Sequence, residues 1–413
     1  MMPFSVLRIW LGGIFNWLVL AAAIYCLWEW FDGVDPPRPV REYRHPQTGE
    51  IVAAGEPGPS RDRQGGWPYL ASGIGLLTIG LAGGWPIVLF LGRPGGSASA
   101  AMPKGKVKSI DRPDGTRLHV EVFGGDDAPT LVFTHGWSLD RSVWSELVAK
   151  LANRFRVIIW DLPGLGRSHG PASGDYDIDK MAEDLSAVVG AAGRGPVILI
   201  GHSIGGMIIQ TYCRLHPAQL GSRVTGIVLL HTTYTNPLKT ALGSSLWKAI
   251  EKPILVPLNH LTIWLAPLAA FSNWQSFLNG NMHIVTRIAS FSGQQTWGQL
   301  NHGAWLAAVA WPAVVARGNL AMLEFDEQRV LPQVEIPALV IAGRHDRMTK
   351  PEASDCLAHL LPNSREASVV GGHLGFWERT SEVAEMITEF AQQQDTPVDE
   401  KPAETKPTNV ATN

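Results

Sequence analysis

The sequence has 413 residues, of which 45% are hydrophobic and only 17% are charged. Its net charge of -3 argues against a nucleic-acid-binding protein, because no domain-wide excess of Lys and Arg is present to neutralise phosphates. The three cysteines, Cys26, Cys213 and Cys356, are odd in number and widely spaced, so they indicate neither a disulfide framework nor a metal-binding cluster.

The first element is an apolar run over residues 9–28, in which Asn16 is the only strongly polar side chain. About twenty apolar residues in a helix match the thickness of a bilayer core of about 30 Å. A cleaved signal peptide is the alternative, since Arg8 precedes the run. However, bulky Trp28 and Trp30 stand where a signal peptide has small residues before its cleavage site. We expect an uncleaved transmembrane helix.

A second uncharged run covers residues 69–91 and is rich in glycine, which lets membrane helices approach closely. A polar loop rich in Pro and Gly over residues 32–66 separates the two runs. We therefore expect a transmembrane helical hairpin within a membrane anchor over residues 1–92. The alternative is that both runs are buried helices of a soluble fold. Two spans place both chain ends on the same side, and although Lys and Arg are nearly balanced across the membrane, we expect the catalytic domain to be cytoplasmic.

Residues 93–106 are expected to be a linker, after which strands and helices alternate. The first two strands flank a turn and predict an antiparallel hairpin. The following runs of Val, Ile and Leu predict parallel strands that helices cover on both faces, so residues 107–235 form the first part of an α/β core. The expected strands are 107–110, 117–123, 130–134, 156–160, 197–200 and 226–230, and the expected helices are 142–151, 179–191 and 207–215.

The alternation stops at residue 236, and residues 236–335 contain six tryptophans but no clear strand. Such a segment is too long for a loop in a compact domain, so it predicts an inserted helical subdomain. The second part of the core then covers residues 336–393. Its expected elements are strands at 338–342 and 367–370 and helices at 352–361 and 382–393. The polar tail over residues 394–413 is expected to be disordered.

A sharp turn around Ser203 is the first candidate for chemistry. The apolar run 197–200 leads into Gly201-His202-Ser203-Ile204-Gly205, and a helix follows at once. A serine at such a strand-to-helix turn has a strained backbone and an exposed hydroxyl, and Gly201 and Gly205 leave the room that the turn needs. Since 43 residues are glycine, a structural Gly-rich turn is the alternative.

A serine hydroxyl becomes a nucleophile only with a base in hydrogen-bond reach and an acid that orients the base. Asp346 follows the strand at 338–342, at the edge where open parallel sheets place their active sites. His373 follows the last strand after two glycines. The alternatives are a solvated loop carboxylate and a surface or core histidine. The order Ser203, Asp346, His373 predicts a catalytic triad.

The motifs FTHGW (133–137), WDLPGLGRS (160–168), GHSIGG (201–206), AGRHD (342–346) and GGHLGFWER (371–379) resemble those of the α/β-hydrolase family over residues 107–393. The resemblance implies a mostly parallel eight-stranded sheet covered by helices, with an inserted helical lid. It implies that Ser203 is the nucleophile, His373 the general base and acid, and Asp346 the orienting acid. It also implies an oxyanion hole formed by the backbone N–H groups of Trp137 and Ile204.

Several other polar residues stand inside these motifs. We interpret His135, His202 and Asp161 as structural, because the corresponding family positions shape the loops. Residues 231–236 hold no carboxylate, which favours Asp346 over this second position for the acid. Ser203 in the nucleophile position indicates acyl transfer, since relatives that open epoxides or displace halides resemble this pattern but carry an aspartate there.

These observations predict a membrane-anchored serine hydrolase, an esterase or lipase that forms an acyl-enzyme on Ser203. The Trp-rich insert indicates a lipophilic ester substrate, although its tryptophans could equally form the core of the subdomain. The expected partners are this small-molecule ester and the lipid bilayer, with no metal and no organic cofactor. Alternatives are a thioesterase, amidase, perhydrolase or carbon–carbon hydrolase on the same triad, or a non-catalytic membrane protein of this fold.

Overall fold

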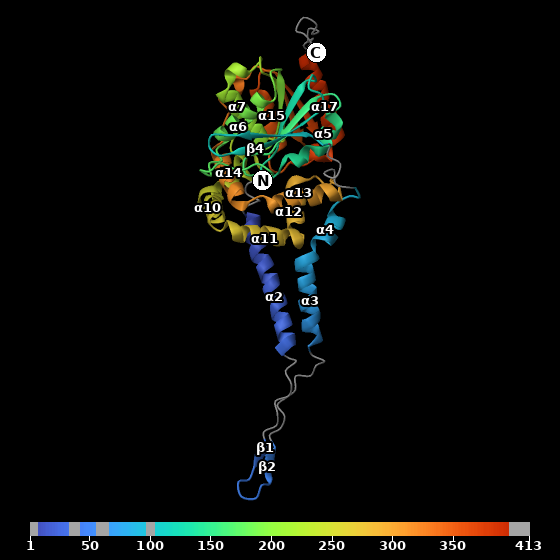
Figure 1. Cartoon of the computed structure of the whole chain (residues 1–413), viewed down its shortest axis with the longest axis vertical. Coiled ribbons are helices and arrows are strands. Elements are labelled where there is room, and N and C mark those ends of the chain that lie inside the picture. Colours follow the sequence, from blue (N-terminus) through green and yellow to red (C-terminus); the bar gives the residue numbers. More distant parts are fainter. Residues whose placement is uncertain (1–6, 33–41, 55–65, 96–103, 396–413) are drawn as a thin grey trace, which may run out of the picture.

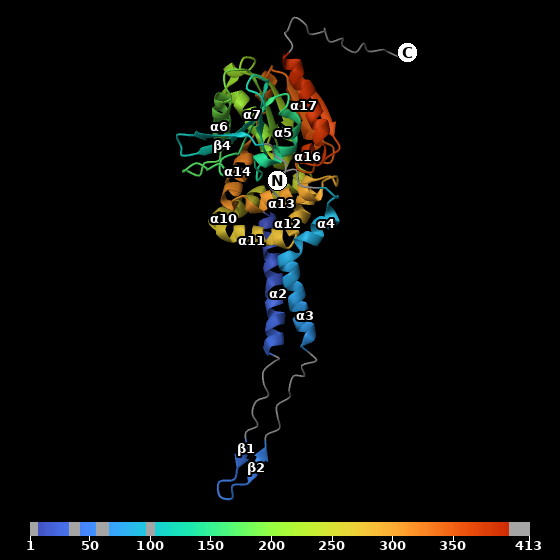
Figure 2. The same ribbon diagram turned by 45° about the vertical axis from the view of Figure 1, so that its right-hand side comes forward.

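The computed structural model describes residues 7–32, 42–54, 66–95 and 104–395. Most of the expected linker and nearly all of the expected disordered tail lie outside the described residues. Along the vertical axis of Figures 1 and 2, a sheet domain is followed by a layer of helices and then by two long helices, α2 and α3, that run side by side.

The sheet domain is built on eight strands in the order β10-β9-β8-β7-β5-β6-β4-β3. The six strands from β5 to β10 pair in parallel, whereas β4 pairs antiparallel with both β3 and β6. The predicted fold class, a mostly parallel eight-stranded α/β-hydrolase sheet, is confirmed. The strands are β3 (Lys106–Asp111), β4 (Arg117–Phe123), β5 (Thr130–Thr134), β6 (Arg156–Trp160), β7 (Val197–His202), β8 (Val224–Leu230), β9 (Ala338–Gly343) and β10 (Ser364–Val369).

Two apolar cores form because the central strands bury side chains on both faces. One face packs against helices that carry Met181, Ile208 and Leu357, and the other against helices that carry Leu147 and Ile387. The helices of the first face are α6 (Ile178–Ala191), α7 (Ile204–Leu215) and α15 (Pro351–Leu360), and those of the second are α5 (Ser145–Leu151) and α17 (Thr380–Asp395). Short segments complete the domain: η4 (Arg141–Trp144), η5 (Pro217–Gln219) and α16 (Gly375–Glu378).

The segment between β8 and β9 is helical and forms the layer between the sheet domain and α2 (Figure 1). We call it the insert. It lies over the edge of the sheet at which β5, β7 and β9 end, and it therefore covers the loops that carry the candidate site. Its helices are α8 (Pro237–Thr240), α9 (Ser244–Ile250), η6 (Glu251–Leu255), α10 (Val256–Trp264), α11 (Ala266–Leu278), α12 (Asn281–Ser290), α13 (Trp297–Val309), α14 (Pro312–Glu324) and η7 (Leu331–Gln333).

The N-terminal apolar segment forms one continuous helix over Arg8–Asp32, which is long and apolar enough to cross a membrane. It consists of η1 (Arg8–Gly12) and α2 (Gly13–Asp32), and β1 (Glu42–Arg44) and β2 (Ile51–Ala54) follow it. The helices α2 and α3 (Trp67–Ala82) pack closely at Gly73, where a side chain would meet Leu27.

The second apolar run is not one straight helix. It divides into α3 and α4 (Gly84–Leu91), which meet at an angle of 61° and reach the length of a membrane span only when they are counted together. Gly83, Gly84 and Pro86 explain the bend, because glycine is a weak helix former and proline removes a backbone hydrogen bond. Two bent helix pairs in the insert likewise reach the length and apolar character of a membrane span only when the two helices of each pair are counted together.

Candidate active site

Ser203 lies in the turn between β7 and α7, in the backbone conformation φ 54°, ψ -120°. A positive φ is costly for a residue with a side chain, so the surroundings must hold it. The Ser203 N–H donates to the Leu230 carbonyl at 3.0 Å, and the Thr232 hydroxyl donates to the Ser203 carbonyl at 2.6 Å. A Cβ at Gly201 would collide with the Gly205 carbonyl, and one at Gly205 with that of Thr134. The turn therefore requires both glycines.

The structure brings Ser203, His373 and Asp346 together from three different loops. His373 Nε2 lies 2.9 Å from Ser203 Oγ, and His373 Nδ1 lies 2.8 Å from Asp346 Oδ2. The three residues follow β7, β10 and β9, whose ends meet at one edge of the sheet. Ser203 is the most exposed of them at 9%, against 1% for His373. This arrangement can transfer a proton from the serine hydroxyl to the imidazole.

Asp346 is held by three further hydrogen bonds. The N–H groups of Met348 and Thr349 donate to Oδ1 at 2.7 and 3.0 Å, and the Thr349 hydroxyl donates to Oδ2 at 2.8 Å. Burial alone would raise the pKa of Asp346, but His373 and these donors outweigh it and lower the pKa below its ordinary value. The carboxylate therefore stays ionised beside the imidazole. Thr349 was not predicted, because a threonine three residues after an aspartate carries no signal by itself.

The expected oxyanion donors come from Ile204, which follows Ser203 in the chain, and from Trp137, which lies in the loop after β5. Ile204 is the first residue of α7, so its N–H has no acceptor within the helix. Trp137 follows β5, and its indole N–H donates to the Val315 carbonyl of the insert at 2.9 Å. Within the described part of the chain, neither backbone N–H donates to a backbone carbonyl. Both groups are thus available to an oxyanion.

His135 and His202 make contacts that support a structural role. His202 Nε2 donates to the His373 carbonyl at 2.8 Å. Burial, followed by the nearby His373, lowers the pKa of His202 well below its ordinary value. His135 Nδ1 donates to the Gly136 carbonyl at 2.8 Å, while its Nε2 accepts from the Leu162 N–H at 3.0 Å. Both imidazoles link loops around the serine, and among the described residues neither ring hydrogen-bonds to the Ser203 hydroxyl.

Asp161 is also part of the scaffold. It accepts from the backbone N–H of Arg141 at 2.8 Å, from the guanidinium of Arg141 at 2.9 Å and from the N–H of Arg167 at 2.8 Å. The carboxylate thereby joins the loop after β6 to η4. None of these hydrogen bonds involves Ser203.

His231 is a buried residue near His373 and Asp346 that no sequence pattern marked. It has a positive φ of 46°, and neither ring nitrogen has a hydrogen-bond partner among the described residues. Its ring centroid lies 6.1 Å from that of His202. Burial lowers the pKa of His231 to about 4, so the residue is neutral near pH 7.

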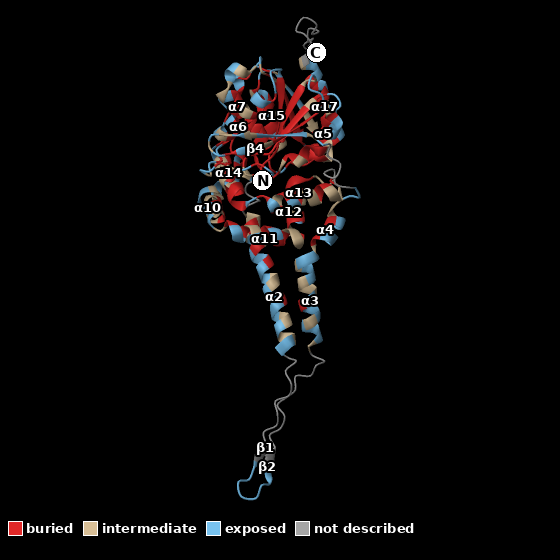
Figure 3. Cartoon of the chain, viewed as in Figure 1, coloured by how far each residue is buried: buried red, intermediate tan, exposed pale blue. Residues whose placement is uncertain are grey.

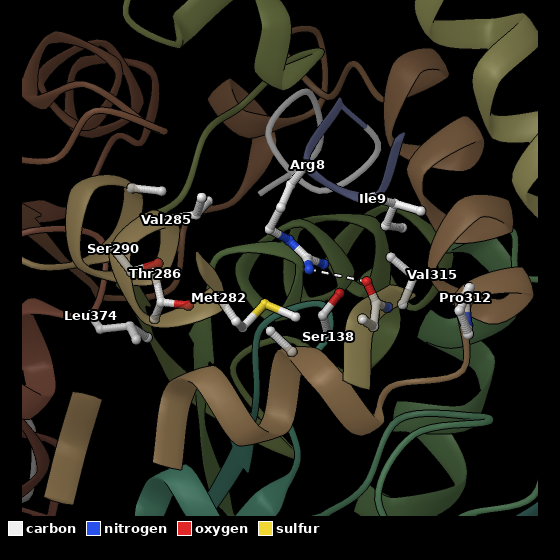
Figure 4. Close-up of a pocket in the computed structure, with 13 residues that line it drawn as sticks. Arg8, Ile9, Ser138, Met282, Val285, Thr286, Ser290, Pro312, Val315 and Leu374 are labelled. Carbon is white, nitrogen blue, oxygen red and sulfur yellow. Dashed lines mark hydrogen bonds between the residues drawn. The ribbon is translucent and has the colours of Figure 1, made fainter. Parts of the chain in front are cut away.

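A pocket lies between the insert and the loops of the candidate site (Figure 4). The core contributes Ser138 and Leu374, which directly follow Trp137 and His373 in the chain. Most of the remaining wall is apolar. The N-terminal helix also reaches into this pocket through Arg8, which the sequence analysis treated only as a flank of the first apolar run. The pocket-lining residues of the insert include Asn273, Met282, Val285, Thr286, Ala289, Ser290, Ala307, Pro312 and Val315.

Residues 129–380 match the family model described as alpha/beta hydrolase fold. Among curated proteins, the chain is 24% identical over 298 residues to a probable oxidoreductase, EphD, of Mycobacterium tuberculosis, covering 68% of this chain. The chain spans about half of that protein's length, 49%. It is 28% identical over 278 residues to a pimeloyl-[acyl-carrier protein] methyl ester esterase of Aeromonas hydrophila, covering 66% of this chain and 98% of the relative.

Solved structures share the fold at lower identity. An esterase from Thermogutta terrifontis matches with a TM-score of 0.57 and 24% identity, covering 70% of this chain and 100% of that one. A bacterial membrane phospholipase A matches with a TM-score of 0.58 and 21% identity, covering 82% of this chain and 100% of that one.

Proposed function

The chain belongs to the α/β-hydrolase fold family, and we propose that it is a membrane-anchored serine esterase that cleaves a lipophilic carboxylic ester through an acyl-enzyme on Ser203. One observation carries the proposal above all. The continuous contact from Asp346 through His373 to Ser203 Oγ, at 2.8 and 2.9 Å, supplies an oriented base to a serine on a strained turn.

The geometry supports a two-step reaction. Ser203 Oγ attacks the ester carbonyl while His373 Nε2 takes the hydroxyl proton, and Asp346 stabilises the imidazolium that forms. The N–H groups of Trp137 and Ile204 hold the negative oxygen of the tetrahedral intermediate. His373 then protonates the departing alcohol. A water molecule, activated by the same imidazole, attacks the acyl-enzyme and releases the acid and free Ser203.

The membrane anchor in this proposal rests on the apolar helix over Arg8–Asp32. Many of its large apolar side chains are exposed, including Leu18 at 63% and Phe31 at 72%, as a lipid-facing helix requires. We propose α2 as one span, α3 with α4 as a second, bent span, and a cytoplasmic catalytic domain. The insert acts as the lid over Ser203, and a bilayer next to it favours lipophilic esters as substrates.

Other acyl-transfer reactions remain as the second candidate, because thioesters and amides use the same triad. The relative from Aeromonas hydrophila is by its name a methyl ester esterase, which favours an oxygen ester for this chain. The membrane phospholipase shares only the fold at 21% identity and does not decide between substrates.

The proposal is tested with p-nitrophenyl esters of increasing acyl length and the detergent-solubilised full chain. Ser203→Ala should abolish turnover, with a loss on the order of 10⁴-fold or more, while circular dichroism stays unchanged. Ser222→Ala, which changes an exposed serine far from the triad in the sequence, serves as the matched control. Equal turnover by wild type and Ser203→Ala would reject Ser203 as the nucleophile.

A further inference from the structure

Arg8 is the one charged residue in the pocket between the insert and the candidate site, as far as the described residues show. It comes from η1, which precedes the membrane helix α2 and inserts between the helices of the lid. Its side chain is half-buried, and Figure 4 shows its guanidinium pointing into the pocket toward Ser138 and Met282. No Asp or Glu lines this pocket.

The guanidinium of Arg8 has a single polar partner in the described part of the chain. Its Nη1 donates to Asn273 Oδ1 at 3.0 Å, and no carboxylate pairs with it. A guanidinium carries five N–H donors, so a neutral amide oxygen leaves most of them unused. A cation in a largely apolar cavity without a counter-ion is costly, and an anionic ligand would relieve that cost. Arg is also the side chain best shaped to grip a carboxylate or phosphate.

The pocket borders the loops that carry Trp137 and His373, although Ser203 itself is not among its lining residues. Ser138 and Leu374 line the pocket and are the chain neighbours of Trp137 and His373. Apolar side chains of α12 and α14 lie around Arg8, among them Val285 and Val315 (Figure 4). A matching ligand would have an ester at the end near the candidate site, an apolar body along the pocket wall, and an anionic group at the end near Arg8.

We propose that Arg8 binds an anionic group of the substrate, so that the substrate is a lipophilic ester carrying a phosphate or carboxylate in addition to the ester that Ser203 attacks. This inference rests on the proposed esterase function. The N-terminal membrane anchor then contributes to substrate selection, because Arg8, which would bind the anionic group of the substrate, lies at the start of the anchoring helix.

Two pairs of substrates test the inference in one neutral detergent. The phosphate pair is 1-oleoylglycerol 3-phosphate and 1-oleoylglycerol, and the carboxylate pair is monomethyl suberate and methyl octanoate. We expect the wild type to prefer the anionic member of at least one pair by about tenfold or more in kcat/KM, with the difference mainly in KM. Whichever pair shows the preference identifies the anion as phosphate or carboxylate.

Arg8→Gln should reduce that preference by about tenfold, whereas Arg8→Lys keeps the charge and should retain part of it. Arg194→Gln is the matched control, since Arg194 is exposed on the loop between α6 and β7, and it should keep the wild-type ratio. The inference is overturned if Arg8→Gln keeps the wild-type ratio of kcat/KM for the anionic and neutral esters, or if the wild type shows no preference in either pair. Hydrolysis of the neutral esters in those cases would still support the proposed esterase function. A wild type that cleaves none of the four esters and no p-nitrophenyl ester counts against the proposed function itself.

Discussion

Ser203, His373 and Asp346 come from three loops that are far apart in the sequence, and they meet through contacts of 2.9 and 2.8 Å. Each was predicted from its place after a strand, because parallel strands end at one edge and bring distant residues together. Thr349 and His231 could not be found in this way. Thr349 is identified by its hydrogen bond to Asp346 at 2.8 Å, and His231 by its complete burial. Neither the hydrogen bond nor the burial can be inferred from one sequence.

The carboxylate of Asp346 gives the first residue-scale prediction. Asp346→Asn should lower kcat by about 10³- to 10⁴-fold, because an amide cannot stabilise the imidazolium or fix its tautomer.

Thr349→Val removes one donor to Asp346 and should lower kcat by about threefold to tenfold, with KM nearly unchanged. Steady-state kinetics on one soluble ester measure both effects. A larger loss in Thr349→Val than in Asp346→Asn would contradict the positioning role assigned to Thr349.

His231 leads to a prediction about stability and pH. Its pKa in the folded protein is about 4, below the ordinary 6.5, so the unfolded chain binds its proton first as the pH falls. This residue therefore contributes stability above pH 6.5 that is lost progressively down to pH 4, in total roughly 3 kcal/mol. His231→Asn keeps a residue that tolerates positive φ but cannot titrate.

The measurement for His231 is the thermal unfolding midpoint between pH 7 and pH 4. The midpoint of His231→Asn should fall less steeply with decreasing pH than that of the wild type. Other buried histidines, such as His202, act in the same direction and remain in the variant, so some slope persists. Identical slopes in the two proteins would show that folding does not lower the pKa of His231.

At the scale of elements, the strands and helices of the core were predicted more closely than those of the insert. The predicted strands 117–123, 130–134 and 156–160 coincide with β4, β5 and β6, because these runs are short, are rich in β-branched and aromatic residues, and end at turn residues. The insert was predicted only as helical, without the bounds of its separate helices. The bend between α3 and α4 was not predicted, although Gly83, Gly84 and Pro86 mark it in retrospect.

The packing of α2 against the insert is the element-scale feature that no sequence pattern indicated. Asn16, the polar residue in the apolar run, donates through Nδ2 to Ser276 Oγ at 2.8 Å and accepts from Asn279 Nδ2 at 2.6 Å. Asn16 is fully buried in this contact. Helix α2 is therefore hydrogen-bonded to helix α11 of the insert and to the residue that caps its C-terminus.

Replacing Asn16 tests this contact. Asn16→Ala leaves Ser276 and Asn279 without their buried partner, which should cost about 1–3 kcal/mol of stability. Thermal unfolding in detergent should show a lower midpoint than in the wild type. Asn153→Ala, at an exposed position near the end of α5, should leave the midpoint unchanged. Equal midpoints for the two variants would mean that α2 does not depend on the lid contact.

At the scale of the whole molecule, exposed apolar surface concentrates at one end. The two long helices α2 and α3 project away from the sheet domain, and much of their surface is exposed (Figure 3). The adjoining face of the insert exposes Trp264, Phe271 and Trp274, at 78%, 50% and 43%. Tryptophans favour the boundary between a bilayer and water, so this end is suited to face a membrane.

Removal of residues 1–92 tests whether the two N-terminal helices attach the protein to the membrane. The truncated protein should leave the membrane fraction on alkaline carbonate washing, whereas the full chain should remain in it. Hydrolysis of short soluble esters should persist, because Ser203, His373 and Asp346 all lie outside the deletion. If the truncated protein still sediments with membranes, the exposed face of the insert, and not the two helices, provides the attachment.

Labelling with a fluorophosphonate probe reports directly on whether Ser203 is an activated nucleophile. We expect one covalent adduct per chain, located on Ser203 by peptide mass spectrometry, absent in Ser203→Ala and retained in Ser222→Ala. A wild type that stays unlabelled while a known serine esterase reacts under the same conditions, or an adduct on a different residue, would refute the role of Ser203 as the nucleophile.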